Sequence, residues 1–124
     1  MTINNPDAYV AGIWDWGILG GCFGQTKIEP ADVDGLVERN GKFLLIEAKG
    51  PTADLKQGQR ITYEALQKTG VFSILIVWGD TNKPERMELW TRSDKVIYNK
   101  AGLQKFREIV SKWFAWADGE STYG

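Results

Sequence analysis

The dipeptide Asn40-Gly41 constrains the fold of this chain more than any other feature of its sequence. It separates two runs rich in Val, Leu, Ile and Phe, and Asn-Gly is typical of the two-residue type I′ turn that joins antiparallel strands. Such a turn also sets the register of the hairpin. Counting outward from it places Asp34 directly opposite Glu47. The sequence therefore predicts two opposed carboxylates near the open end of a β-hairpin.

Successive side chains of a strand point to opposite faces, so Asp34, Glu47 and Lys49 share one face of this hairpin. Opposed residues have Cβ atoms about 5 Å apart, and like charges at that distance destabilise the pair. A hard divalent cation bound by the carboxylate oxygens would remove this cost. The alternative is a solvated hairpin end, in which both acids face water. Lys49 favours the first interpretation, because it follows an apolar run at 43–46 that is unsuited to an exposed edge.

An Asp followed by Glu-x-Lys at the end of a hydrophobic strand resembles the signature of the PD-(D/E)xK nuclease superfamily. Here the matching residues are Asp34 and Glu47-Ala48-Lys49. The resemblance implies that Asp34 and Glu47 bind Mg²⁺ or Mn²⁺, with the Ala48 carbonyl as a further ligand, and that Lys49 acts in the chemistry. The chain departs from the signature at Val33, where the superfamily motif has proline.

A helix expected over residues 55–69, beginning at an Asp54–Gln57 capping box, carries a second match. Gln59 and Tyr63 resemble the QxxxY motif of the RecB-like branch. That resemblance implies a catalytic role for Gln59, in orienting a ligand or water, and places Tyr63 at the nucleic acid. Residues four apart on a helix are neighbours.

Lys56 and Arg60 form a second pair of this kind, on the face of the helix next to Gln59 and Tyr63. We expect these two cations to contact phosphate, because they would lie beside the carboxylates. The alternative is an ordinary solvated helix surface.

In the first part of the chain, the sequence predicts a helix over residues 7–19 that ends at Gly20-Gly21. Asp15 lies in it between Trp14 and Trp16. Members of the superfamily often supply an extra acid from a first helix, so Asp15 resembles a third metal ligand. A solvated acid beside an aromatic patch is the other interpretation, and the sequence does not separate the two.

The remaining segments complete an α/β pattern. Residues 71–79 are almost continuously apolar and predict a central strand, parallel to the preceding one because a helix separates them. Two further strands, 87–92 and 95–98, precede a last helix that begins after Asn99. The prediction is a single domain, 1–124, with a restriction-endonuclease-like mixed sheet flanked by helices. Its order is an α-β-β-α-β core followed by β-β-α.

The composition restricts the catalytic and metal-binding groups that the chain can use. The chain has 124 residues and no histidine, which excludes histidine-based acid–base catalysis and favours an all-oxygen site for Mg²⁺ or Mn²⁺. A single cysteine, Cys22, excludes an intramolecular disulfide, fits a reducing cytoplasm, and is expected to be a small buried hydrophobe. The net charge is −1, yet residues 48–112 hold 12 basic and 7 acidic residues. Such a basic stretch is compatible with phosphate contact and equally with a solvated surface.

The predicted function is Mg²⁺-dependent hydrolysis of phosphodiester bonds in DNA by a cytoplasmic protein without a membrane partner. Cutting both strands of a duplex would require a homodimer. Two alternatives stay open: a module of the same fold that binds nucleic acid or protein without cleaving it, and an unrelated interaction protein that uses its tryptophans as an interface.

Overall fold

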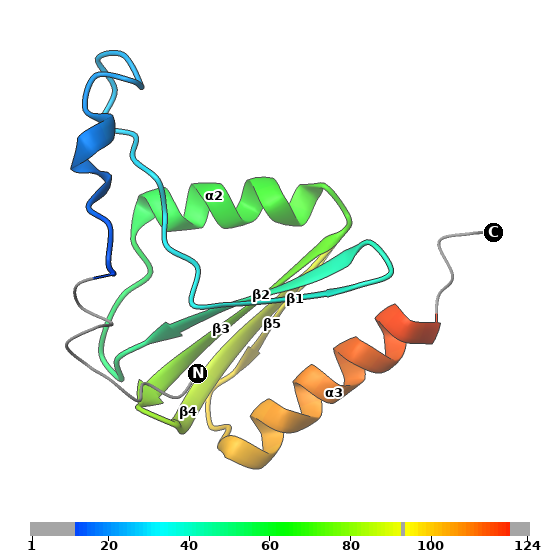
Figure 1. Ribbon diagram of the computed structural model, residues 1–124. Helices are drawn as coiled ribbons and strands as arrows, with labels where there is room; N and C mark the ends of the chain where they lie inside the picture. Colours follow the sequence, from blue (N-terminus) through cyan, green and yellow to red (C-terminus); the bar gives the residue numbers. More distant parts are fainter. Residues whose placement is uncertain (1–11, 93, 120–124) are drawn as a thin grey trace. The chain divides into compact units, whose positions relative to one another are not determined.

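The computed structural model describes residues 12–92 and 94–119. Contacts divide the chain into two units, Met1–Asp32 and Val33–Gly124. The second unit is an α/β structure in which a five-stranded mixed sheet carries two helices (Figure 1). Its elements are β1 (Gly35–Arg39), β2 (Lys42–Lys49), α2 (Gln57–Lys68), β3 (Phe72–Asp80), β4 (Lys83–Thr91), β5 (Asp94–Tyr98) and α3 (Leu103–Gly119). The α/β class and the mixed sheet predicted from the sequence are confirmed.

The hairpin is the predicted one. Arg39 pairs with Lys42 across the turn, and Asn40 and Gly41 have φ angles of 52° and 76°, as a type I′ turn requires. The register continues without a bulge to Gly35, which pairs with Ile46. Asp34 therefore comes directly before β1, on the side of the hairpin where Glu47 lies on β2.

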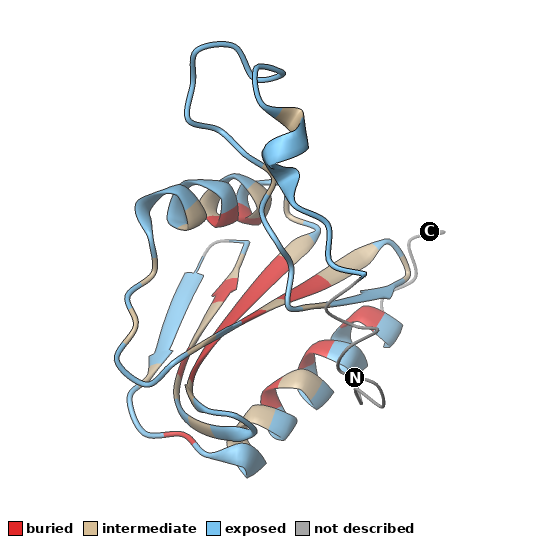
Figure 2. Ribbon diagram, turned by 60° about the vertical axis from the view of Figure 1, so that its left-hand side comes forward, coloured by how far each residue is buried: buried red, intermediate tan, exposed pale blue. Residues whose placement is uncertain are grey.

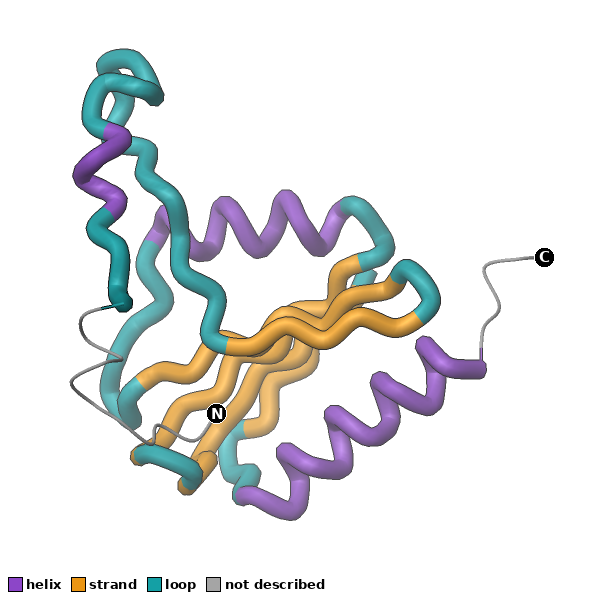
Figure 3. The backbone as a smooth tube through the Cα atoms, in the orientation of Figure 1, coloured by secondary structure: helices purple, strands orange, loops and turns teal. Residues whose placement is uncertain are grey.

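The strands lie in the order β1-β2-β3-β4-β5, and only the β2–β3 pair is parallel. The smooth trace in Figure 3 shows the chain leaving β2, passing through α2 and returning to the sheet as β3. The predicted parallel crossover is thus confirmed. It is the step that brings α2 over the end of the strand bearing Glu47.

The two helices cover opposite faces of the sheet (Figures 1 and 2). Alternate residues of the central strands form two separate cores, because neighbouring side chains point to opposite faces. The core under α2 contains Leu45, Tyr63, Ile74, Ile76, Trp78 and Trp90. The core under α3 contains Leu44, Leu75, Val77, Met87, Ala101, Ile109, Trp113 and Ala117.

Three hydrogen bonds place α2 along the sheet. At its beginning, the Trp78 indole N–H donates to the carbonyl of Ala53 at 2.7 Å and holds the connection that enters the helix. At its end, the buried Gln67 amide donates to the carbonyls of Thr91 and Asp94 at 2.5 and 3.2 Å. Both ends of the helix are therefore tied to the sheet through polar groups as well as through the core.

The predicted start of this helix is wrong by two residues. The helix begins at Gln57 with Lys56 as its N-cap, and Asp54 does not cap it. The reason is that the Gln59 side-chain oxygen accepts the Lys56 backbone N–H at 3.2 Å and takes over the capping. The helix ends at Lys68, one residue before the expected end, and Gly70 follows its C-cap, Thr69, with a φ angle of 80°.

In the first unit, residues 7–11 of the expected helix lie outside the described residues, and 12–15 are not helical. Within residues 12–32, the structure forms a 3₁₀ helix, η1, at Trp16–Leu19. Its N-cap is Asp15, whose carboxylate accepts the Gly17 backbone N–H at 2.8 Å. None of residues 12–32 is buried, so the prediction of a buried Cys22 is also wrong: the residue is exposed. In the part of the chain that the structure describes, no helix combines the length and the apolar character needed to cross a membrane.

A substitution at Gly79 tests how closely β3 and β4 approach each other. The register shifts between Trp78 and Gly79, and a Cβ at Gly79 would lie 2.1 Å from the Lys83 carbonyl oxygen. We expect Gly79→Ala to lower the free energy of unfolding by about 3 kcal/mol or more, because the backbone would have to move. Urea denaturation measures the change.

Gly58→Ala provides the matched control. An added Cβ there meets nothing within 4 Å, and alanine is favoured over glycine in a helix by up to about 1 kcal/mol. Equal stability of Gly79→Ala and the unmodified protein would contradict the close approach.

Candidate active site

The candidate active site is built around Glu47. This residue is near the end of β2, and only 6% of its surface is exposed. Both carboxylate oxygens accept hydrogen bonds from α2: Oε1 from the Gln59 amide at 3.0 Å and Oε2 from the Tyr63 hydroxyl at 2.9 Å. The four-residue spacing puts both donors on the side of the helix that faces the sheet. The helix thus positions a buried carboxylate without supplying a charge to it.

Lys49 approaches Glu47 from the same strand. Its ammonium nitrogen is 3.9 Å from Glu47 Oε1 and donates to Gln59 Oε1 at 2.7 Å. Gln59 Oε1 also accepts the Lys56 backbone N–H. Because two donors hold this oxygen, the Gln59 NH₂ group must face Glu47. One amide therefore connects the carboxylate, the lysine and the first turn of α2.

Asp34 lies on the neighbouring strand connection. Its Oδ2 accepts the Ala48 backbone N–H at 2.9 Å, and the residue is exposed. This bond holds Asp34 beside the residue that follows Glu47, as the hairpin register predicts. The structure therefore brings together Asp34, Glu47, Lys49 and Gln59 in one cluster, with the Ala48 backbone at its edge.

Burial dominates the electrostatics of the cluster. Desolvation raises the pKa of Glu47 above its usual value, and the nearby Asp34 carboxylate raises it further. The Tyr63 hydrogen bond and the Lys49 charge oppose this shift in part. Burial and the hydrogen bond to Glu47 also raise the pKa of Tyr63, so its hydroxyl stays a donor at neutral pH.

The donor set fits a magnesium-type ion. Among the described residues, no group of three or more His, Cys, Asp or Glu side chains could hold a metal together. Mg²⁺, however, commonly uses one or two carboxylates and completes its shell with water. Asp34 and Glu47 offer two adjacent carboxylates, each oxygen of which has two lone pairs. The mutual repulsion that raises the pKa of Glu47 is also the kind that a divalent cation would relieve.

The sequence predicts three further site residues: Lys56, Arg60 and Asp15. Lys56 is exposed at the N-cap of α2, and the Arg60 guanidinium lies 5.6 Å from the centre of the Trp90 ring. Asp15 belongs to the first unit, where it caps η1. Its role as a metal ligand stays a prediction, as do the phosphate contacts of Lys56 and Arg60.

Trp90 is a supporting residue that sequence reasoning missed. It is fully buried, and Tyr63 packs against it edge-on with ring centroids 6.4 Å apart. The contact limits the positions open to the Tyr63 ring and hence to the hydroxyl bound to Glu47. Its signal in the sequence is the alternation along residues 83–91, which becomes informative only once the pairing of β3 and β4 is known.

Comparisons of the chain with protein-family models, with curated proteins and with solved structures found no match.

Removal of the Tyr63 hydroxyl tests whether it supports the buried carboxylate. In Tyr63→Phe, Glu47 Oε2 loses its donor at a site with little access to water. We expect the free energy of unfolding at pH 7 to fall by about 1–3 kcal/mol, the usual cost of an unsatisfied buried group. Tyr98→Phe removes the same group away from Glu47 and serves as the control. Equal effects of the two substitutions in urea denaturation would contradict this role.

A pH series on Asp34→Asn tests the carboxylate pair. Because the pKa of Glu47 is raised in the folded state, that state binds more protons than the unfolded one. The metal-free protein should therefore lose stability as the pH rises from the usual glutamate pKa, about 4.3, through the raised value. The asparagine keeps an oxygen for the Ala48 N–H but removes the Asp34 charge, which adds to the effect of burial on the pKa of Glu47.

We thus expect Asp34→Asn in EDTA to show a smaller loss of stability between pH 4 and 8. At pH 7 it should be at least as stable as the unmodified protein. Thermal unfolding measures both quantities, and Asp80→Asn, at an exposed acid on β3, is the control. A variant clearly less stable at pH 7 would show that the pair is not repulsive.

Proposed function

We propose that this protein is a metal-dependent nuclease that hydrolyses phosphodiester bonds in DNA. The observation that carries the proposal is the buried Glu47 carboxylate beside Asp34, with the Lys49 ammonium 3.9 Å away and held by Gln59. The finer fold assignment, restriction-endonuclease-like, is part of the proposal. The parallel β2–β3 pair joined through α2 supports it.

Asp34 and Glu47 would hold Mg²⁺ or Mn²⁺, with the Ala48 carbonyl as a further ligand; when bound, such an ion polarises a phosphate and lowers the pKa of a coordinated water. The protein's own contribution is orientation. Gln59 and Tyr63 hold the two Glu47 oxygens from the helix side, so that the carboxylate is positioned before a ligand arrives.

Lys49 has the chemistry to stabilise the transition state. An ammonium has three N–H donors, and Gln59 takes one of them. The others can donate to a phosphate oxygen as negative charge develops on it. Only 10% of the Lys49 side chain is exposed, and a fixed charge in such a water-poor site acts more strongly than one in solution.

The first turn of α2 supplies the proposed phosphate contacts. Lys56 precedes the helix and Arg60 lies one turn further on, so both cations are near the N-terminal end, which itself favours anions. A chain of this size offers one such centre, and cleavage of both strands of a duplex would take a homodimer.

The hydrogen bonds of Glu47 also support a second candidate, a binding module of the same fold without cleavage. Both Glu47 oxygens already have donors, and burial raises the pKa of this residue. A network of this kind could serve stability alone. The two candidates differ in whether a divalent ion binds and whether DNA is cut.

Two substitutions separate metal binding from chemistry. Saturating Mn²⁺ at about 100 times its Kd should stabilise the unmodified protein by about 2.7 kcal/mol, and Asp34→Asn should lose most of this effect together with cleavage. Lys49→Ala removes a cation from the site, so metal binding should persist while cleavage falls at least about 100-fold. Calorimetric metal titration and cleavage of labelled single-stranded, duplex and branched DNA measure the two effects.

Lys83→Ala, at the beginning of β4, is the control for loss of a lysine. If Lys49→Ala cuts DNA as fast as an active unmodified protein, Lys49 is only a neighbour of Glu47. If no metal binds and no DNA is cut, the binding module is the better description.

A further inference from the structure

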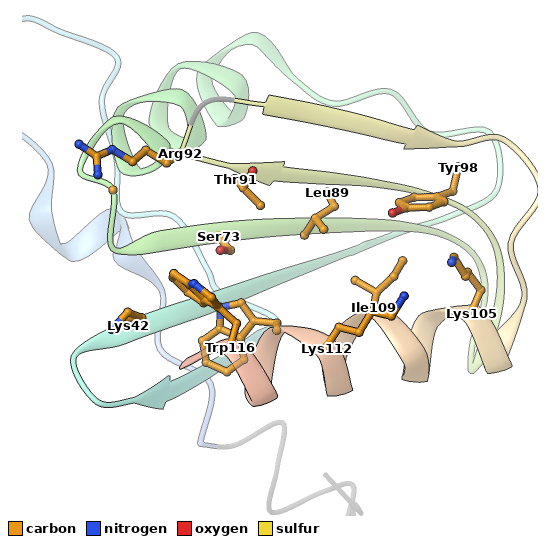
Figure 4. A pocket seen from close by; sticks show the side chains of 12 residues that line it. Lys42, Ser73, Leu89, Thr91, Arg92, Tyr98, Lys105, Ile109, Lys112 and Trp116 are labelled. Atoms are coloured by element: carbon orange, nitrogen blue, oxygen red, sulfur yellow. The ribbon is translucent and has the colours of Figure 1, made fainter. Parts of the chain in front are cut away.

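A cavity lies between the sheet and α3. Its volume is about 560 Å³, within the range of roughly 300–1,000 Å³ typical of small-ligand pockets. Figure 4 shows side chains of the sheet, among them Ser73, Leu89 and Tyr98, facing Lys112 and Trp116 of α3. The cavity occupies the face opposite α2. It is therefore separate from the candidate active site.

The charged residues that line the cavity are all basic. Four basic residues line the cavity, and none of the described lining residues is acidic; the basic residues are Lys42, Arg92, Lys105 and Lys112. Glu108 bridges two of them from outside the lining, 3.4 Å from Lys105 and 3.1 Å from Lys112. One acid against four bases leaves a net positive charge. The cavity is thus suited to an anion.

Trp113 provides an independent indication of a ligand. The residue lines the cavity and is only 6% exposed, and its indole Nε1–H has no hydrogen-bond partner among the described residues. A buried donor without an acceptor costs free energy of folding, and most such groups in proteins are satisfied. An acceptor atom of a bound molecule would satisfy it.

Aromatic rings and cations adjoin one another in this cavity. The Lys42 ammonium lies 5.4 Å from the Trp116 ring centre, and that of Lys105 lies 5.2 Å from the Tyr98 ring centre. Indole and phenol rings are the usual stacking partners of nucleic-acid bases, and ammonium groups bind phosphate. A ligand with a planar ring and a phosphate would meet both groups at once.

We propose that the cavity between the sheet and α3 binds a nucleoside phosphate. The phosphate is held by Lys105 and Lys112, the base packs against Trp116 or Tyr98, and the Trp113 N–H donates to an acceptor on the ligand. This site goes beyond the proposed nuclease activity and does not depend on it. The ligand's source is either a free nucleotide or one unit of a nucleic-acid strand.

The positions of Lys42 and Glu47 along β2 explain why the cavity and the candidate active site are distinct. Lys42 begins the strand and lines the cavity, whereas Glu47 lies five residues further on and faces α2. At about 3.3 Å per residue these positions are roughly 17 Å apart along the strand. One nucleotide cannot reach both.

The test is calorimetric titration of the full chain in EDTA. The probes are the four deoxynucleoside 5′-monophosphates, one nucleoside, inorganic phosphate and an eight-residue oligothymidylate. We expect at least one monophosphate to bind at least tenfold more tightly than either the nucleoside or inorganic phosphate. Tighter binding of the oligonucleotide than of the thymidine monophosphate would identify a strand as the source, and the reverse would identify a free nucleotide.

Three substitutions locate the site. Lys112→Gln, at a side chain that is 74% exposed, should weaken binding about fivefold or more, and Trp116→Leu should do the same through loss of the ring. Trp113→Phe removes the unpartnered donor and keeps an aromatic ring, so it should weaken binding as well. Lys68→Gln, on α2, is the matched control and should bind normally.

Asp34→Asn should also bind nucleotide normally, which separates this proposal from the nuclease proposal. The proposal is overturned if no nucleotide binds, or if inorganic phosphate binds as tightly as the monophosphates. It is equally overturned if binding is unchanged in both Lys112→Gln and Trp116→Leu, because the ligand would then lie elsewhere.

Discussion

The arrangement of the second unit depends on a buried carboxylate, Glu47, whose ion pair with Lys49 is long, at 3.9 Å. Glu47 is 6% exposed, and its oxygens are held by an amide and a phenol from α2. A buried charge is costly unless it is well hydrogen-bonded, and burial accordingly raises the pKa of this residue. The helix, the hairpin end and Lys49 are all placed so that they meet this one group. A residue selected only for stability at that position could be apolar.

The parallel pairing of β2 and β3 allows α2 to reach Glu47. Since β2 and β3 run in the same direction, the chain must cross from one end of the sheet to the other between them, and α2 is that crossing. The first turn of the helix therefore lies close to the end of β2, where Glu47 and Lys49 are. Trp78 and Gln67 hold the helix at its two ends. Small shifts of α2 would separate Gln59 and Tyr63 from the carboxylate.

The same sheet keeps two chemistries apart. Successive side chains of β2 point to opposite faces of the sheet. Those of Leu45, Glu47 and Lys49 lie on the α2 side, and those of Lys42 and Leu44 lie on the α3 side. One face thus carries the cluster of Asp34, Glu47 and Lys49, and the other carries a basic, aromatic cavity. An antiparallel hairpin with a fixed turn prevents exchange between them, because a slip by one residue would reverse every side chain.

The sequence by itself determined the hairpin register, the central apolar strand and the crossover helix. These follow from local rules: Asn40 and Gly41 accept positive φ angles, strand side chains alternate, and a helix between two buried strands makes them parallel. The approach of Asp34 to the Glu47 strand could be derived in the same way, from counting along two paired strands.

Only the tertiary structure decided which donors hold Glu47, where α2 begins and which residues are buried. Gln59 displaces Asp54 from the capping role because its oxygen meets the Lys56 N–H and the Lys49 ammonium together. Cys22 is exposed because nothing in residues 12–32 is buried. The cavity lined by Trp113 has no signal in the sequence at all. Contacts of this kind join residues far apart in the chain, and their geometry depends on how helices pack on a sheet, which local propensity and spacing do not encode.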